Sequence, residues 1–193
     1  MNKSSLILFY GIPMKSLFSF LLCFFVFILP STAQYNHRGP LFEGDKFPEI
    51  VLKTIDGEVL KTEDLKGKVV FYNFYFAACP PCIAQKGGLN ELYEMFHAND
   101  DVVFISVTFD NKATIEQFRK RYDVQFKIVS INRRKMSQFL YGYPTNFLVD
   151  MDGKIVLIRG SGNIDATKAK ERLLAEFSPA IQNELRKLKS ENR

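Results

Sequence analysis

The stretch Val69-Val-Phe-Tyr-Asn-Phe-Tyr-Phe-Ala-Ala-Cys79-Pro-Pro-Cys82 places two cysteines directly after a run of β-branched and aromatic residues. Such an apolar run predicts a strand that is buried on both faces. Because Pro80 and Pro81 are tolerated only in a first helical turn, a helix is expected to begin at once after the strand. Cys79 and Cys82 would then lie one turn apart on one face, where they can close a disulfide suited to reversible redox chemistry.

The two cysteines are expected to have different roles. Cys79 would lie in the exposed first turn of the helix, where the helix dipole and free backbone N–H groups stabilise a thiolate. Cys82 would lie one turn deeper, in a more apolar setting that raises the pKa of its thiol. We therefore expect Cys79 to attack a substrate disulfide and Cys82 to resolve the mixed disulfide.

Three other interpretations of the pair were open. A structural disulfide across so short a loop would remove little entropy from the unfolded chain. A metal site would need more nitrogen or sulfur ligands, and the only histidines, His37 and His97, do not have a metal-ligand spacing. A single-cysteine peroxidase would need activating groups, and Phe76-Ala77-Ala78 supplies no hydroxyl or basic group. The sequence thus favours a redox-active pair without a metal.

The rest of the chain alternates between strand and helix patterns. Asp56-Gly57 is a strong turn signal and predicts a β-hairpin around residues 55–57. The other expected elements are strands at 102–109 and 126–129, helices at 110–122 and 135–140, a second hairpin of 146–149 and 154–158, and helices from Asp165 to Phe177 and from Ser178 onward. This order indicates an α/β fold with a central mixed β-sheet flanked by helices.

Composition and charge narrow the function classes. The chain has 193 residues, and residues 34–193 hold 24 basic and 21 acidic side chains, which leaves a net charge of only +3. Without a basic face or tail there is no electrostatic footprint for nucleic acid, so nucleic-acid binding is set aside. The 160 residues after the N-terminal segment suit one domain with a core of its own.

The N-terminal segment is typical of a secretory signal peptide. Lys15 is followed by an apolar run at 17–29 and by small residues at Ser31 and Ala33. We expect residues 1–33 to be a signal peptide, with a retained membrane anchor as the alternative because an apolar stretch at 6–14 could lengthen the run.

Export would determine which cysteines the mature protein keeps and whether they can form a lasting disulfide. Cys23 would leave with the signal, so the mature chain would keep only the pair at 79 and 82, in a compartment where disulfides persist. The expected organisation after the signal is an irregular lead-in at 34–45, an α/β domain at 46–177 and a C-terminal helical extension at 178–193.

Two segments together resemble thioredoxin-like proteins. Residues 69–82 resemble the strand and redox turn of these proteins, and Tyr143-Pro144-Thr145-Asn146-Phe147-Leu148-Val149-Asp150 resembles their cis-proline loop and following strand. The hairpin, the long gap between Cys82 and Pro144 and the export signal are most similar to the TlpA-like, ResA-like branch of extracytoplasmic thiol-disulfide oxidoreductases. The resemblance covers about Phe42 to Phe177 and implies a thioredoxin-like fold.

The resemblance also implies a substrate site beside the cysteines. The Tyr143-Pro144 bond is expected to be cis, which would leave the Tyr143 backbone free to pair with a substrate strand. The residues expected to contact substrate are Tyr143, Pro144, Ala78 and Pro80.

The implied partners are proteins. The expected substrates are protein dithiols and disulfides in a periplasmic or otherwise extracytoplasmic compartment, without an organic cofactor or a metal. A membrane-embedded thiol reductase is the expected electron donor. Since Pro80 and Pro81 have no N–H groups to stabilise a thiolate, the pair should be reducing, and we expect the protein to act as a reductant.

Several positions depart from the family pattern. Asn73 stands where thioredoxin has a buried acid, and Gln85 replaces a Glu that is common three residues after the second cysteine. No obvious carboxylate therefore remains to accept the proton of Cys82. Ala78 stands where Trp is usual, and Gly87-Gly88 stands at the position of a proline that kinks the helix, which glycines can bend by another route. These departures motivate an alternative function, a thioredoxin-fold binding module with little or no redox turnover.

Overall fold

The computed structural model describes residues 40–140, 142–160 and 162–191. The expected signal at 1–33 and the first half of the expected lead-in, residues 34–39, lie outside these residues. Within the described part of the chain, no helix is both long enough and apolar enough to cross a membrane.

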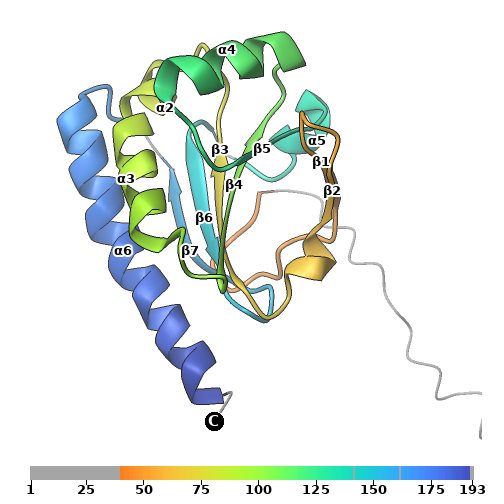
Figure 1. Cartoon of the computed structure of the whole chain (residues 1–193), viewed down its shortest axis with the longest axis vertical. Coiled ribbons are helices and arrows are strands. Elements are labelled where there is room, and N and C mark those ends of the chain that lie inside the picture. Colours follow the sequence, from red (N-terminus) through yellow and green to blue (C-terminus); the bar gives the residue numbers. More distant parts are fainter. Residues whose placement is uncertain (1–39, 141, 161, 192–193) are drawn as a thin grey trace, which may run out of the picture. The chain divides into compact units, whose positions relative to one another are not determined.

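A five-stranded mixed sheet forms the centre of the fold (Figure 1), as the sequence predicted. The strands follow the order β5-β4-β3-β6-β7, with β3, β4 and β5 parallel and with β6 antiparallel to both β3 and β7. Their bounds are β3 (Val69–Phe74), β4 (Val102–Thr108), β5 (Lys127–Ser130), β6 (Thr145–Val149) and β7 (Ile155–Gly160).

Strand β3 is buried on both faces because its side chains alternate between two apolar cores. Val69 and Phe71 belong to one core, and Val70 and Tyr72 belong to the other. The polar exception is Asn73, which is fully buried near the end of the strand. The redox turn follows directly after that end.

The helices cover both faces of the sheet. Their bounds are α2 (Pro80–Ala84), α3 (Lys86–Phe96), α4 (Lys112–Tyr122), α5 (Arg133–Ser137) and α6 (Ala166–Glu191). Leu89 of α3, Ile115 of α4 and Leu173 of α6 share one core, whereas Met136 of α5 lies in the other. In Figure 1, α3 and α6 run beside each other along one side of the sheet, and α5 lies on the opposite side.

The expected N-terminal hairpin is present. β1 (Val51–Lys53) and β2 (Val59–Lys61) pair antiparallel, and Gly57 in the turn has a φ of +94°, a conformation that glycine adopts readily. A short 3-10 helix, η1 (Thr62–Leu65), follows. Leu52 anchors the hairpin in the core that contains α5.

The helix after the cysteines breaks two residues earlier than expected. Gln85 ends α2 and precedes α3, so the break is not at Gly87-Gly88. Gly88 has a packing role instead, because a Cβ there would lie 2.9 Å from the Cα of Lys170 in α6. Its missing side chain lets α3 and α6 approach closely, whereas Gly87 faces open space.

The C-terminal region is one helix, and the expectation of a restart at Ser178-Pro179 was wrong. Pro179 lies inside α6, where an interior proline costs about 3 kcal/mol. The apolar stripe continues across it, since Phe177, Ile181 and Leu185 are all buried. Each such side chain contributes about 1.5–3 kcal/mol on burial, which offsets the proline.

Helix α5 begins two residues before the expected start at Lys135. Asn132 precedes it, and its Oδ1 accepts a hydrogen bond of 2.8 Å from the Arg134 N–H, which caps the first turn. The apolar residues Phe139 and Leu140 lie after the helix and are buried.

Candidate active site

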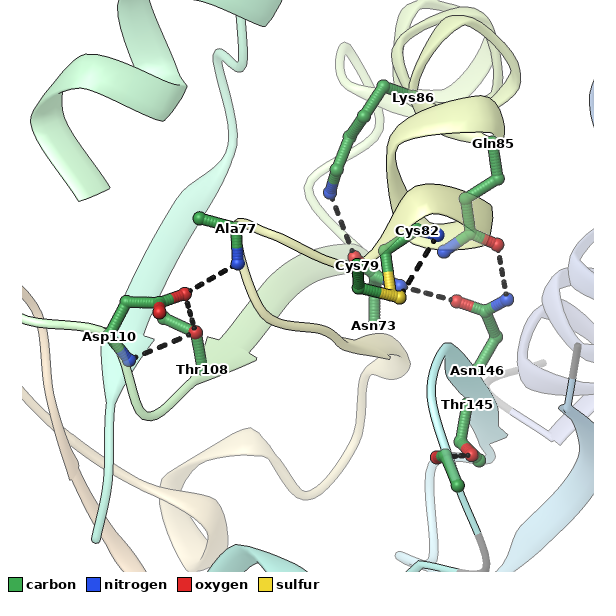
Figure 2. The surroundings of a disulfide bond; sticks show 11 residues. Asn73, Ala77, Cys79, Cys82, Gln85, Lys86, Thr108, Asp110, Thr145 and Asn146 are labelled. Carbon is green, nitrogen blue, oxygen red and sulfur yellow. Dashed lines mark hydrogen bonds between the residues drawn. A yellow bond between two sulfur atoms is a disulfide. The ribbon is translucent and has the colours of Figure 1, made fainter. Parts of the chain in front are cut away.

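Cys79 and Cys82 form a disulfide, with an S–S distance of 2.09 Å and their Cα atoms 5.2 Å apart. Cys79 is the N-cap of α2, and its Sγ accepts a hydrogen bond of 3.2 Å from the Cys82 N–H. Because Pro80 and Pro81 lack an N–H, the Cys82 amide is the first donor that the helix offers. The structure thus brings the predicted pair together (Figure 2).

The expectation that Cys79 is exposed was wrong for this disulfide form. Only 2% of Cys79 is exposed, and Cys82 is fully buried. Cys79 belongs to the apolar core, and the partly buried rings of Phe76 and Tyr143 pack against that core. Ala78 on one side of Cys79 and Pro80 on the other are exposed, so the surface next to the pair includes these two residues.

The predicted cis peptide bond between Tyr143 and Pro144 is present. The Tyr143 ring meets the rings of Phe76 and Phe109 edge-on, with centroids 5.4 and 6.0 Å apart. Burial raises the pKa of the Tyr143 phenol, and the charge of Arg133 opposes this shift. Tyr143 therefore joins the cis-proline loop to the residues that follow β3 and β4.

A cleft lies where the redox turn, the cis-proline loop and α6 meet. Its lining includes Pro81, Gln85, Pro144, Asn146, Arg159 and Glu176. Arg159 and Arg172 both contact the Glu176 carboxylate, at 3.1 and 3.0 Å, so the acid there is matched by two cations. Because Pro144 and Pro81 line the same cleft, Pro144 lies beside the redox turn.

Asp110 holds the loop that leads to Cys79. Its Oδ2 accepts hydrogen bonds of 2.7 Å from both the Ala77 N–H and the Thr108 hydroxyl (Figure 2). Asn111, not Asp110, caps α4, because its Oδ1 accepts from the Thr114 N–H at 3.0 Å. The carboxylate thus has a positioning role in the turn.

A buried polar network runs across three strands behind the redox turn. Asn73 of β3 is the register partner of Ser106 in β4 and of Asn146 in β6. The Asn73 Nδ2 donates to Asn146 Oδ1 at 2.8 Å, and the Ser106 hydroxyl donates to Asn73 Oδ1 at 3.1 Å. Asn146 Nδ2 donates in turn to Gln85 Oε1 at 3.1 Å (Figure 2). The site is therefore lined by amides and a hydroxyl.

Lys86 completes this network, and sequence reasoning missed it. Its Nζ donates to Asn73 Oδ1 at 3.1 Å, and only 3% of the residue is exposed. The same Nζ lies 4.1 Å from the centroid of the Tyr75 ring and 5.0 Å from that of Phe118. Burial lowers the pKa of Lys86 from 10.5 to about 7. An amine that is readily protonated and deprotonated near neutral pH therefore lies behind the redox turn.

A sequence signal for this lysine did exist. Cys82, Lys86, Leu89 and Tyr93 are spaced as one face of a helix, and the other members of that face are apolar. A lysine within an apolar stripe would be buried with the rest of that helix face. Because lysine is almost never fully buried without a partner, its position indicates a buried polar contact.

Comparison with known proteins identifies the family. The AhpC/TSA family model matches residues 43–158. The thiol-disulfide oxidoreductase ResA of Geobacillus thermodenitrificans is 32% identical over 140 residues, which cover 71% of this chain and 77% of that protein. ResA of Bacillus cereus is 30% identical over 115 residues, 58% of this chain and 66% of the relative.

A solved structure shows the same fold. The crystal structure of a protein described as a putative thiol:disulfide interchange protein DsbE from Chlorobium tepidum matches with a TM-score of 0.59 and 26% identity, covering 70% of this chain and 97% of that one. With the disulfide, the cis-proline loop and the mixed sheet in place, the chain belongs to the AhpC/TSA family and, within it, to the ResA-like thiol-disulfide oxidoreductases.

Proposed function

We propose that the protein exchanges disulfides with other proteins of the cell envelope, with Cys79 as the attacking thiol and Cys82 as the resolving thiol. The observation that carries this proposal is the closed disulfide at the start of α2, in which Cys82 is the deeper partner. In the reduced form, the Cys82 N–H that now bonds Cys79 Sγ would help to stabilise a Cys79 thiolate. The two sulfur atoms carry the electrons, so the exchange needs no cofactor.

The proposed substrate surface consists of Ala78, Pro80, Tyr143 and Pro144. Ala78 and Pro80 are exposed on either side of Cys79, and the cis-proline loop lies beside the redox turn. A substrate strand that pairs with the Tyr143 backbone would bring its disulfide to Cys79. Ala78 leaves this surface smaller than a large aromatic side chain would.

We further propose that the protein acts as a reductant, supplied with electrons by a membrane-embedded thiol reductase. Pro80 and Pro81 leave α2 without two N–H donors that could stabilise the Cys79 thiolate, which favours the disulfide form. A pair that prefers to be oxidised gives its electrons to substrates more readily.

The proposed location is outside the cytoplasm, with residues 1–33 as a cleaved signal, 34–45 as a lead-in, 46–177 as the redox domain and 178–193 as a helical extension. The charged, apolar and small-residue regions before Gln34 support this. N-terminal sequencing of the protein from envelope material should give a start near Gln34. A start at Met1 or Met14 in a membrane fraction would show that the segment is an anchor.

Insulin-disulfide reduction separates the enzyme from a binding module. The purified protein should reduce insulin with dithiothreitol as electron source, and a Cys79→Ser variant should show only the background rate, because its nucleophile is gone. Equal rates for the two proteins would favour a module that binds partners without turnover.

A further inference from the structure

Lys86 is a buried amine that the exchange of electrons between the two sulfurs does not itself require. It follows Cys82 by four residues, across the break between α2 and α3. Both residues are buried, and the Lys86 Nζ lies over the rings of Tyr75 and Phe118, which belong to the same core as Cys82. Figure 2 shows Lys86 extending from the start of α3 to Asn73, which lies at the end of the strand that leads into the redox turn.

The second step of the exchange needs a proton acceptor. Cys82 must become a thiolate before it can attack Cys79, and burial in an apolar core raises the pKa of a thiol. Gln85 is an amide and cannot accept a proton near neutral pH. The Asp110 carboxylate accepts hydrogen bonds from Ala77 and Thr108 and holds the loop before Cys79.

We propose that Lys86 accepts the proton of Cys82 when Cys82 resolves the mixed disulfide, an inference that rests on the proposed roles of the two cysteines. The neutral Lys86 amine takes the proton of the Cys82 thiol and becomes an ammonium. The Cys82 thiolate attacks Cys79 Sγ, the bond between Cys79 and the substrate sulfur breaks, and the substrate leaves as a thiolate. The Lys86 ammonium returns its proton to this leaving thiolate, directly or through water.

Atoms and electrons balance over this sequence. The cysteine pair loses two electrons and forms one disulfide, and the substrate disulfide gains these electrons and leaves as two thiols. The proton from Cys82 passes through Lys86 to one of these thiols, and the proton that left Cys79 is available to the other. No further oxidant or reductant is needed.

The surroundings of Lys86 suit both of its protonation states. Burial disfavours the charged amine, and with a pKa of about 7 a large share of the Lys86 side chains is neutral near pH 7. Once it is protonated, Asn73 Oδ1 accepts a hydrogen bond and the faces of the Tyr75 and Phe118 rings attract the cation. The transfer also makes an ammonium and a thiolate together, so each buried charge has a partner.

The groups that surround Lys86 come from β3, β4, α4 and α6. From β3 and its end come Asn73 and Tyr75, and burial together with the charge of Asp110 raises the pKa of the Tyr75 phenol, against the opposing charge of Arg119. From β4 comes the Ser106 hydroxyl, and from α4 the Phe118 ring. Helix α6 packs on α3 at Gly88, where the nearest residue of α6 is Lys170. The Lys170 ammonium forms an ion pair with Glu91 at the surface.

The test is a stopped-flow reaction of the reduced protein with dithiobis(nitrobenzoate), which releases one coloured thiolate in each step. The first release reports the attack by Cys79 and depends on reagent concentration, whereas the second reports resolution by Cys82 and does not. In Lys86→Met we expect the second release to be slower by about a hundredfold at pH 7, with little change in the first.

The pH profile distinguishes proton transfer from a structural role. The rate of the second release should rise through about pH 7 in the unchanged protein, where Lys86 becomes neutral. In Lys86→Met it should keep rising through about pH 8.5 and above, as for a thiol that loses its proton to solvent. Lys120→Met, which removes an exposed lysine from α4, is the matched control and should leave both phases unchanged.

Each outcome has a separate meaning. An unchanged second phase and pH profile in Lys86→Met would overturn the role of Lys86 and leave the proposed function intact. Loss of both phases in the unchanged protein, or a first phase that survives in Cys79→Ser, would overturn the cysteine roles themselves. If Lys86→Met did not fold, Lys86→Gln, which keeps a donor toward Asn73, would be compared in the same way.

Discussion

A Cys82→Ala variant is expected to stop the reaction after its first step and accumulate mixed disulfides through Cys79. The physical reason is that the thiol able to displace the substrate from Cys79 has been removed, while Cys79 and its surroundings remain. Insulin reduction should fall to the rate of the Cys79→Ser protein, and disulfide-linked adducts should appear on non-reducing gels and disappear on reduction.

The control for this trap is the reciprocal replacement. Cys79→Ala should form no adducts, because Cys82 is fully buried and Cys79 is the residue flanked by exposed positions. Adducts that form through Cys82 in the absence of Cys79 would reverse the assignment of the two roles. The proteins captured on Cys82→Ala, identified by mass spectrometry, would also name the substrates.

The second large effect is on stability, where Lys86→Met is expected to make the folded protein more stable at neutral and acidic pH. Lys86 has a folded-state pKa of about 7 against an ordinary value of 10.5, so the unfolded chain binds more protons between these pH values. The cost of burying the charge is therefore present in full below about pH 7 and fades as the pH rises toward 10.5. A shift of this size corresponds to about 5 kcal/mol, and we expect the variant to recover roughly 2 to 5 kcal/mol.

Urea unfolding of the disulfide form at pH 6.5 and pH 9.5 measures this. The gain in the free energy of unfolding of Lys86→Met over the unchanged protein should be largest at pH 6.5 and shrink at pH 9.5. Asn73 Oδ1 keeps the Ser106 hydroxyl as a donor, so the substitution leaves no unpaired acceptor there. A variant that is less stable at pH 6.5 would mean that the ring and amide contacts of the ammonium outweigh its burial.

The frame of the fold was readable from the sequence because its strongest signals are local. The apolar run of β3, the Asp56-Gly57 turn and the helix start at Pro80 each depend on neighbouring residues, and all three are in the structure. The cis-proline loop could be predicted only through its resemblance to a family, since most X-Pro bonds are trans.

The parts that could not be predicted depend on distant contacts. Pro179 is a strong local stop signal, but the core beneath α6 outweighs it. Lys86 is buried because Asn73, Ser106 and Asn146 meet in register across three strands, and strand register is not visible in the order of residues. Sequence reasoning therefore found the redox-active cysteines and missed the buried amine of Lys86.

The continuous helix α6 also determines where the protein can be held without blocking its chemistry. Its first half lines the cleft beside the redox turn, and the residues after Phe177 continue for about 20 Å at 1.5 Å per residue. In Figure 1 the first turns of α6 lie near α2, and its last turns lie far from α2. A fluorophore, an affinity tag or a surface linkage attached after Glu191 would thus leave the cysteines open to large protein substrates, which makes this end the one to use for immobilised capture.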